Sequence, residues 1–181
     1  MKHSQLTHLF LATVIFTASV LVCGCGHAHL TKGTLVDPLQ NQLLKLETNK
    51  ANKGKRVSVI GFPNFTGDIK TGINDDPVLN VNSERDGKGR LLASFTIPFG
   101  KGANEVHVPE TFTNHDIVLY DNDGLKHSYA EKLQFSFTLS IQDNRTRITQ
   151  YPLNAAGLPI MDSAIKVYPT YLTDIRIDKI Q

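Results

Sequence analysis

The chain has 181 residues, the length of one ordinary domain with room for a targeting segment and a linker. Apolar residues make up 40% and charged residues 20% of it, so neither a disordered polyelectrolyte nor a multispan membrane protein fits. The formal net charge of +2 is too small to predict a nucleic-acid partner.

The first residues have the plan of a secretory signal peptide. Lys2 supplies a positive charge, and residues 9–22 form a 14-residue run without a charge. A membrane-spanning helix needs about 20 apolar residues, so this run is too short for a stable transmembrane anchor. The small-residue pair Cys23 and Gly24 then leads into Cys25, as in a cleavage region.

The sequence Val22-Cys23-Gly24-Cys25 resembles the lipobox of bacterial lipoproteins. The resemblance implies cleavage between Gly24 and Cys25, a diacylglycerol on the Cys25 sulfur and an acyl chain on its new amino group. Several acyl chains give lasting anchorage where one alone is marginal. Gly26, rather than an aspartate, follows the cysteine, which by the same resemblance favours sorting to the outer membrane. An ordinary cleaved signal peptide is the alternative.

This interpretation divides the chain into three parts: a signal peptide over 1–24, a tether over 25–36 and a folded domain over 37–181. If Cys23 leaves with the signal peptide and Cys25 is acylated, the mature chain has no thiol left for a disulfide. The stability of the domain must then come from packing.

The domain is predicted to open with a helix over residues 38–49. Asp37 is an N-cap residue, and Pro38 suits the first helical position. Leucines recur at helical spacing at Leu39, Leu43 and Leu46. We expect this stripe to pack on the domain, with a free amphipathic helix on the membrane surface as the alternative.

From residue 55 onward the hydrophobic period changes to two, which predicts strands. The clearest strand is 133–142, where apolar and polar side chains alternate throughout. Asp143 and Asn144 supply turn chemistry and predict a hairpin into the next strand. The connections 64–89 and 154–163 are long and rich in turn residues. The expected strands cover residues 55–63, 91–99, 106–108, 117–120, 133–142, 145–151, 165–168 and 172–180.

Three segments resemble strands of bacterial OB-fold-like proteins: 54–62 (GKRVSVIGF), 117–121 (IVLYD) with Gly124, and 132–137 (KLQFSF). The resemblance implies a mainly β domain, built as a small antiparallel barrel preceded by one α-helix and closed by strands from residues 167–180. An immunoglobulin-like or transthyretin-like β-sandwich is the alternative, because the connection 64–89 is longer than a compact OB fold requires.

The segment 121–124 (DNDG) is a candidate ligand or metal loop. Alternating oxygen ligands with a glycine are what Ca²⁺ loops use, but with this glycine at the sixth position Glu131 comes one residue too late for the twelfth. A plain turn between two strands explains the same pattern. Asp121, Asp123 and His127 are the residues that such a site would use.

No nucleophile elbow, P-loop or dinucleotide-binding fingerprint is present in the sequence. His27 and His29 could chelate a metal from alternate positions, but two histidines make a weak site and a solvated tether explains them better. No cofactor is expected. We therefore expect a non-catalytic envelope lipoprotein, anchored in the outer-membrane lipid bilayer through Cys25, that binds a protein or envelope partner. The alternatives are a metal-dependent domain using the 121–124 loop and an oligosaccharide-binding domain.

Overall fold

The computed structural model describes residues 30–37, 41–65, 76–154 and 156–180, which form a mainly β structure with one α-helix, as predicted. The strands are β1 (Thr34–Leu35), β2 (Arg56–Phe65), β3 (Val78–Asn82), β4 (Leu91–Thr96), β5 (Val106–His107), β6 (Val118–Tyr120), β7 (Lys126–Ser128), β8 (Leu133–Ile141), β9 (Ile148–Gln150), β10 (Ile165–Val167) and β11 (Thr170–Lys179). The helix is α1 (Gln42–Glu47), and the short 3₁₀ helices are η2 (Lys50–Asn52), η3 (Asn114–Asp116) and η4 (Met161–Ser163).

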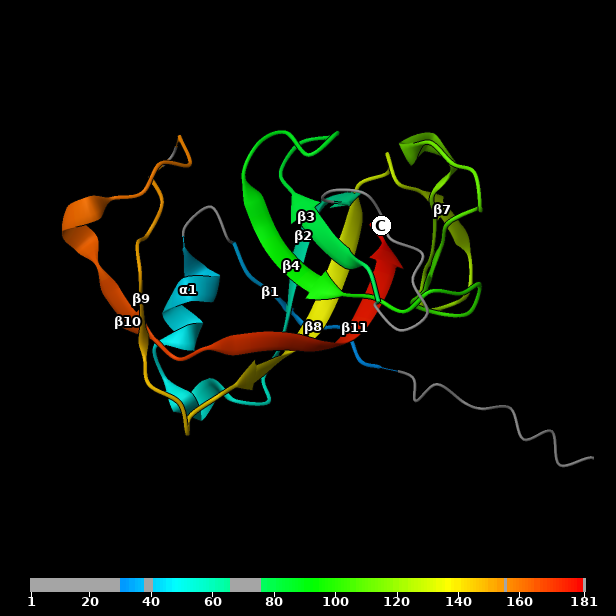
Figure 1. The fold of residues 1–181 in the computed structure, drawn as a ribbon. Helices are drawn as coiled ribbons and strands as arrows, with labels where there is room; N and C mark the ends of the chain where they lie inside the picture. Colours follow the sequence, from blue (N-terminus) through cyan, green and yellow to red (C-terminus); the bar gives the residue numbers. More distant parts are fainter. Residues whose placement is uncertain (1–29, 38–40, 66–75, 155, 181) are drawn as a thin grey trace, which may run out of the picture.

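One large sheet organises the molecule (Figure 1). Its strands follow the order β11-β8-β2-β3-β4 and are all antiparallel to their neighbours, while β1 pairs in parallel with β2. Two small sheets flank it, β5-β6-β7 and the two-stranded β9-β10. Figure 1 shows these small sheets at opposite ends of the large one.

Strand β2 belongs to both halves of the large sheet because it changes partner at Gly61. Residues Arg56–Gly61 pair with β8, and Phe62–Phe65 pair with β3. A Cβ atom at Gly61 would lie 2.6 Å from the Asn82 carbonyl oxygen and 2.6 Å from a methyl carbon of Val81. The change of partner from β8 to β3 therefore requires a residue without a side chain at position 61.

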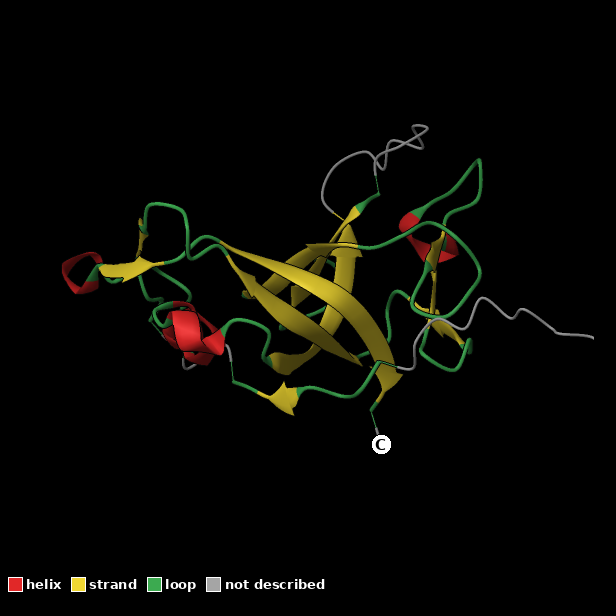
Figure 2. Ribbon diagram, turned by 90° about the horizontal axis from the view of Figure 1, so that it is seen from below, coloured by secondary structure: helices red, strands yellow, loops and turns green. Residues whose placement is uncertain are grey.

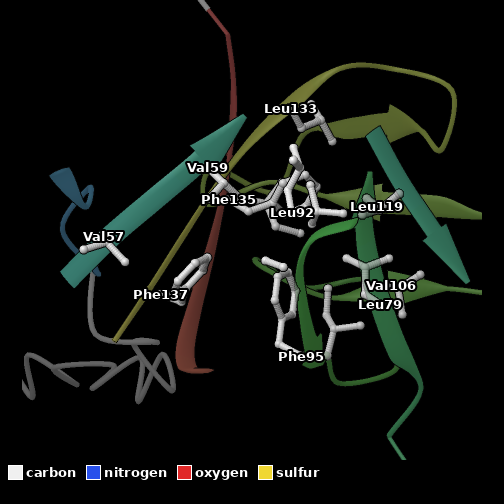
Figure 3. Packing of buried hydrophobic residues seen from close by; sticks show 14 of the residues in the cluster. Val57, Val59, Leu79, Leu92, Phe95, Val106, Leu119, Leu133, Phe135 and Phe137 are labelled. Carbon is white, nitrogen blue, oxygen red and sulfur yellow. The ribbon is translucent and has the colours of Figure 1, made fainter. Parts of the chain in front are cut away.

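The sheet curls around its core, and Figure 3 shows the buried side chains that β2, β3, β4 and β8 contribute to this core. Strand β4 stands three places from β8, which in a flat sheet would separate them by about 14 Å. Yet the Phe95 ring of β4 lies 5.9 Å from the Phe135 ring and 6.1 Å from the Phe137 ring of β8, centroid to centroid. The two ends of the sheet thus share one apolar core, in which burial of each phenylalanine stabilises the fold by about 1.5–3 kcal/mol.

The mainly β, antiparallel class is confirmed, but the sheets do not close into the expected barrel. The C-terminal strand, expected to close it, pairs with β8 over Thr170–Thr173 and again over Arg176–Lys179. It stays next to β8, and β4 forms the other end of the sheet. The two halves of the large sheet are joined by β2, which pairs with β8 in one half and with β3 in the other.

Two strands differ from their prediction. The segment 64–89, expected to be a connection, contains β3. The sequence of this strand has only a short alternation of apolar and polar residues, and the turn residues on either side of it hid the strand signal. In β4, Leu91 alternates with Ala93 and Phe95 in the sequence, but its side chain is 50% exposed whereas Leu92, Ala93 and Phe95 are buried. A register shift opposite Leu91, between Val81 and Asn82 of β3, is the physical reason.

Helix α1 is shorter than predicted. It begins at Gln42 after Asn41, whose backbone has φ 57°, and residues 38–40, with the predicted Pro38 start, lie outside the described residues. The Asn41 side chain contacts other parts of the chain: its amide donates to the Leu153 carbonyl, and its oxygen accepts from the Leu153 N–H. Leu43 and Leu46 pack against the core, as the leucine stripe predicted.

The hairpin expected after β8 is wrong. Residues Thr170–Thr173 of β11 already occupy the edge of β8 there, so the chain turns away after Gln142 and β9 pairs with β10 instead. We call β9, η4, β10 and the described chain between them the arm. It projects from one end of the molecule in both ribbon views (Figures 1 and 2).

Replacing Gly61 by alanine tests whether β2 needs a glycine where it changes partner from β8 to β3. We expect the free energy of unfolding to fall by about 1–3 kcal/mol, because the new methyl group overlaps the β3 backbone. Chemical denaturation measures it, with Thr96→Ala as the control, since that side chain is exposed on β4. Equal stability of the Gly61→Ala variant and the unchanged protein would contradict the role of Gly61.

Candidate functional site

The predicted 121–124 loop is the turn between β6 and β7. One oxygen of the Asp121 carboxylate accepts hydrogen bonds from the Asp123 N–H at 2.9 Å and the Leu125 N–H at 2.8 Å. Gly124 has φ 75° and its N–H donates to the Asp121 carbonyl. The segment is therefore an Asx-type turn, and its first carboxylate oxygen is already occupied by backbone donors.

The second Asp121 oxygen lies 2.9 Å from Nε2 of His127, and Nδ1 of His127 lies 3.0 Å from a carboxylate oxygen of Glu131. The other Glu131 oxygen accepts from the Ser128 N–H at 2.8 Å. We call these three side chains the Asp–His–Glu cluster. Asp121 and His127 are buried, whereas Glu131 lies at the surface.

Each member of the Asp–His–Glu cluster stabilises the charged form of its neighbour. Burial by itself would lower the pKa of His127, but its hydrogen bonds to Glu131 and Asp121 outweigh burial and raise this pKa. Burial would likewise raise the pKa of Asp121, yet the hydrogen bonds from His127 and two backbone amides bring it below its ordinary value. The hydrogen bond from His127 also lowers the pKa of Glu131. The arrangement favours an imidazolium between two carboxylates.

This geometry decides what the cluster can do. Both ring nitrogens of His127 are engaged and the ring is only 5% exposed, so neither nitrogen is open to a metal or a substrate. Within the described residues no group of three or more His, Cys, Asp or Glu side chains could hold a metal ion. We infer a structural role for the cluster, which holds the β6–β7 hairpin to the turn before β8.

Of the predicted site residues, the structure brings Asp121 and His127 together but leaves Asp123 outside the cluster with an exposed side chain. Glu131 was missed as a partner of His127. The spacing of four residues between them was visible in the sequence, but only the turn after β7 makes Glu131 reach back to the ring.

Two asparagines fasten this region to the large sheet. The Asn104 side-chain oxygen accepts from the Ile177 N–H of β11, and its amide donates to the Asn122 side chain at 3.2 Å. The Asn122 N–H in turn donates to the Ile177 carbonyl at 2.8 Å. Asn104 and Asn122 are both buried, so these bonds are shielded from water.

A second arrangement concerns residues 30–36, expected to be the end of a flexible tether. They run along β2 as an extra strand, and we call them the strap. The Gly33 N–H donates to the Ser136 hydroxyl and the Gly33 carbonyl accepts from the Ser58 hydroxyl, both at 3.1 Å. A Cβ atom at Gly33 would overlap the Val57 backbone, so only glycine allows this close approach.

Two arginines hold the start of the strap. Arg56 donates from Nε to the Thr31 carbonyl at 2.8 Å, and Arg176 donates from Nη1 to the Leu30 carbonyl. Arg176 is itself fixed by a two-pronged contact with the buried Asp178 carboxylate, with donor–acceptor distances of 2.8 and 2.9 Å. Residues 30–36, which the sequence assigned to the tether, therefore pack on the domain.

The predicted lipid attachment point lies just before the strap. Cys25, the cleavage partner Gly24 and the histidines His27 and His29 are all outside the described residues. Leu30 is the fifth residue after Cys25, so at full extension they are at most about 18 Å apart. None of the helices in the described ranges is long and apolar enough to cross a membrane.

Comparison of the chain with protein families, with curated proteins and with solved structures gives no match.

Replacing His127 by glutamine tests the cluster. Because the folded pKa of His127 is raised, its protonation stabilises the fold fully below the ordinary value of 6.5, and this stabilisation is lost as the pH rises through the folded pKa. The pKa values of Asp121 and Glu131 are lowered in the folded state. Their ionisation therefore stabilises the fold when the pH is above their ordinary pKa values, and this stabilisation is lost as the pH falls through their folded-state pKa values.

We therefore expect His127→Gln to cost about 1–3 kcal/mol of unfolding free energy near pH 5.5, and less near pH 9. Urea denaturation across this pH range measures the difference. His115→Gln, which changes an exposed histidine, is the control. A cost that does not vary with pH would show that His127 is not held as an imidazolium.

Replacing Gly33 by valine tests the strap. We expect loss of about 1–3 kcal/mol of unfolding free energy, because the side chain displaces the strap from Val57. Hydrogen exchange at the Gly33 and Val36 amides, which donate to Ser136 and to the Ser58 carbonyl, should also become faster. Thr34→Val is the matched control because Thr34 is exposed in β1. Unchanged protection of these amides would contradict the packing of the strap.

Proposed function

We propose that this chain is a lipid-anchored lipoprotein of the bacterial outer membrane whose β domain is a non-catalytic binding or scaffold module for an envelope protein. The lipobox-like residues that end at Cys25 support the anchorage. The strap is the observation that carries the proposal, because it fixes to the domain a segment that begins five residues after that cysteine.

A short link gives the domain a defined position at the bilayer. Only residues 26–29 separate Cys25 from the strap, so the acylated end keeps the strap within about 18 Å of its attachment point. A long flexible tether would let the domain diffuse far from the membrane. Here the anchor would instead hold the Leu30 end of the domain close to the lipid surface.

The arm is the surface that we assign to the protein partner. Half of the ten exposed large apolar side chains in the described residues lie on it, which is a concentration typical of an interaction surface. Leu158 and Met161 near its tip are 62% and 64% exposed. The arm residues concerned are Ile148, Tyr151, Leu158, Ile160 and Met161.

The arm and the anchored end lie at opposite ends of β11. The arm joins β11 just before Thr170, whereas the Leu30 carbonyl is bound by Arg176, about 20 Å further along the strand. Figure 1 shows the same separation between the arm and the blue start of the described chain. An anchored domain would thus present the arm away from its own attachment point, where a protein can reach it.

Metabolic labelling with a radioactive fatty acid tests the anchorage. We expect the label on the full-length protein and in the membrane fraction, and we expect the Cys25→Ala variant to carry none because the acylated sulfur is absent. Cys23→Ala is the control that changes the other cysteine. An unlabelled wild type would refute the lipoprotein assignment.

Crosslinking in intact cells tests the arm. A photo-crosslinking amino acid at position 158 should yield one defined adduct, and Met161→Asp should reduce it about fivefold or more, as expected for loss of an apolar contact worth about 1 kcal/mol. Leu125→Asp is the matched control, because Leu125 is 61% exposed but lies in the β6–β7 turn. Equal adduct yields from both variants would exclude the arm as the binding surface.

A further inference from the structure

A pocket of about 420 Å³ lies at the root of the arm. Helix α1 forms one wall with Leu43 and Leu44, and β4 contributes Leu92. Leu172 of β11 and Tyr151 of the arm share the lining with the polar side chains of Asn41, Arg90, Ser94 and Gln150. The pocket is thus built from elements that meet only because the arm turns back onto α1.

One carboxyl group faces this pocket, that of Glu47 in the last turn of α1. Within the described residues the Glu47 carboxyl accepts no hydrogen bond and belongs to no ion pair, whereas its backbone carbonyl accepts a hydrogen bond from the Tyr168 N–H. Burial raises the pKa of Glu47 to about 7. Among the described residues, the carboxyl group of Glu47 therefore has no hydrogen bond or ion pair that would offset the cost of ionising it.

The other polar groups around the pocket do not supply that compensation. Arg90, which directly precedes β4 and also lines the pocket, donates to the Asn41 side chain at 2.8 Å. Tyr151 contributes a phenol ring on the arm side, and the hydroxyl of nearby Tyr168 accepts from Arg147 at 2.8 Å. No charged neighbour counts among the causes that shift the pKa of Glu47.

The chemistry of this pocket selects a cation on an apolar stem. A bound cation would offset the cost of ionising a carboxylate among leucines. An alkyl chain would contact the same leucines, as the stem of a lysine does when it crosses apolar surface. Leu91, which is 50% exposed, and Tyr151, which is 38% exposed, line the pocket and would be covered by residues on either side of that lysine.

We propose that the pocket at the root of the arm binds a lysine side chain of a polypeptide partner, with the Glu47 carboxylate as its counter-ion. The proposal rests on the proposed function, in which the arm is the protein-binding surface. It adds the chemistry by which that surface recognises its partner: one primary ammonium group flanked by apolar residues.

The test uses the full-length protein and the peptide acetyl-Leu-Lys-Leu-amide, followed by NMR at the Leu43, Leu44 and Tyr151 amides. We expect saturable binding that weakens about tenfold between pH 8 and pH 6, since a group of pKa about 7 loses about nine-tenths of its charge over this range. Acetylating the lysine nitrogen of the peptide should weaken binding at pH 8 by about tenfold or more.

Glu47→Gln should weaken binding of the peptide as much as acetylation of its lysine does, and it should remove the pH dependence of binding. Glu110→Gln, which changes an exposed carboxylate outside the pocket, should alter neither the affinity nor its pH dependence. In the wild type, saturating peptide should also return the pKa of Glu47 from about 7 towards 4.5. This shift is measured at the side-chain carboxyl carbon, so it needs no variant to fold.

Three results would overturn the proposal: equal binding of the acetylated peptide, full binding by Glu47→Gln, or n-pentylammonium binding as tightly as the peptide, which would make the ligand a free amine. These measurements involve neither the anchor nor the arm tip. Their failure would leave fatty-acid labelling and crosslinking from position 158 intact, and failure of the proposed function would leave the peptide titration intact.

Discussion

The architecture depends on the change of partner in β2 at Gly61. Because this residue has no side chain, the β3 backbone at Asn82 can approach it while the preceding residues stay paired with β8. The sheet bends at this point and folds its β4 end over its β8 end, which brings Phe95 onto Phe135 and Phe137. One continuous sheet thereby encloses an apolar core without closing into a barrel.

Strand β11 organises the rest of the molecule around that sheet. Its beginning carries the arm, and its second half, beyond an irregularity between Thr173 and Arg176, receives both the strap and the β5–β7 region. Asp174 lies within this irregularity with φ 51°, and its carbonyl accepts from Arg56. The proposed anchor end and the proposed partner surface are thus linked through one strand.

Features set by neighbouring residues were predictable. The alternation in residues 133–142 predicted β8 and its buried face, because a strand places every second side chain on the same side. The leucine spacing predicted α1, and the turn chemistry of 121–124 predicted the β6–β7 connection. Strand β3 and the inward turn of Leu92 were not predictable, because each depends on pairing between β3 and β4 rather than on its own residues.

The sequence by itself determined the class of fold, the N-terminal lipobox-like motif and the turn that contains Asp121. Only the tertiary structure decided that β8 pairs with β11 instead of the following segment, which leaves the arm free, and that Glu131 completes the pair of Asp121 and His127. It also placed Glu47 in a pocket that the arm completes. The reason is the same in each case: local periodicity specifies which side of an element is apolar, whereas partners distant in sequence are chosen by competition for edges and buried volume across the whole chain.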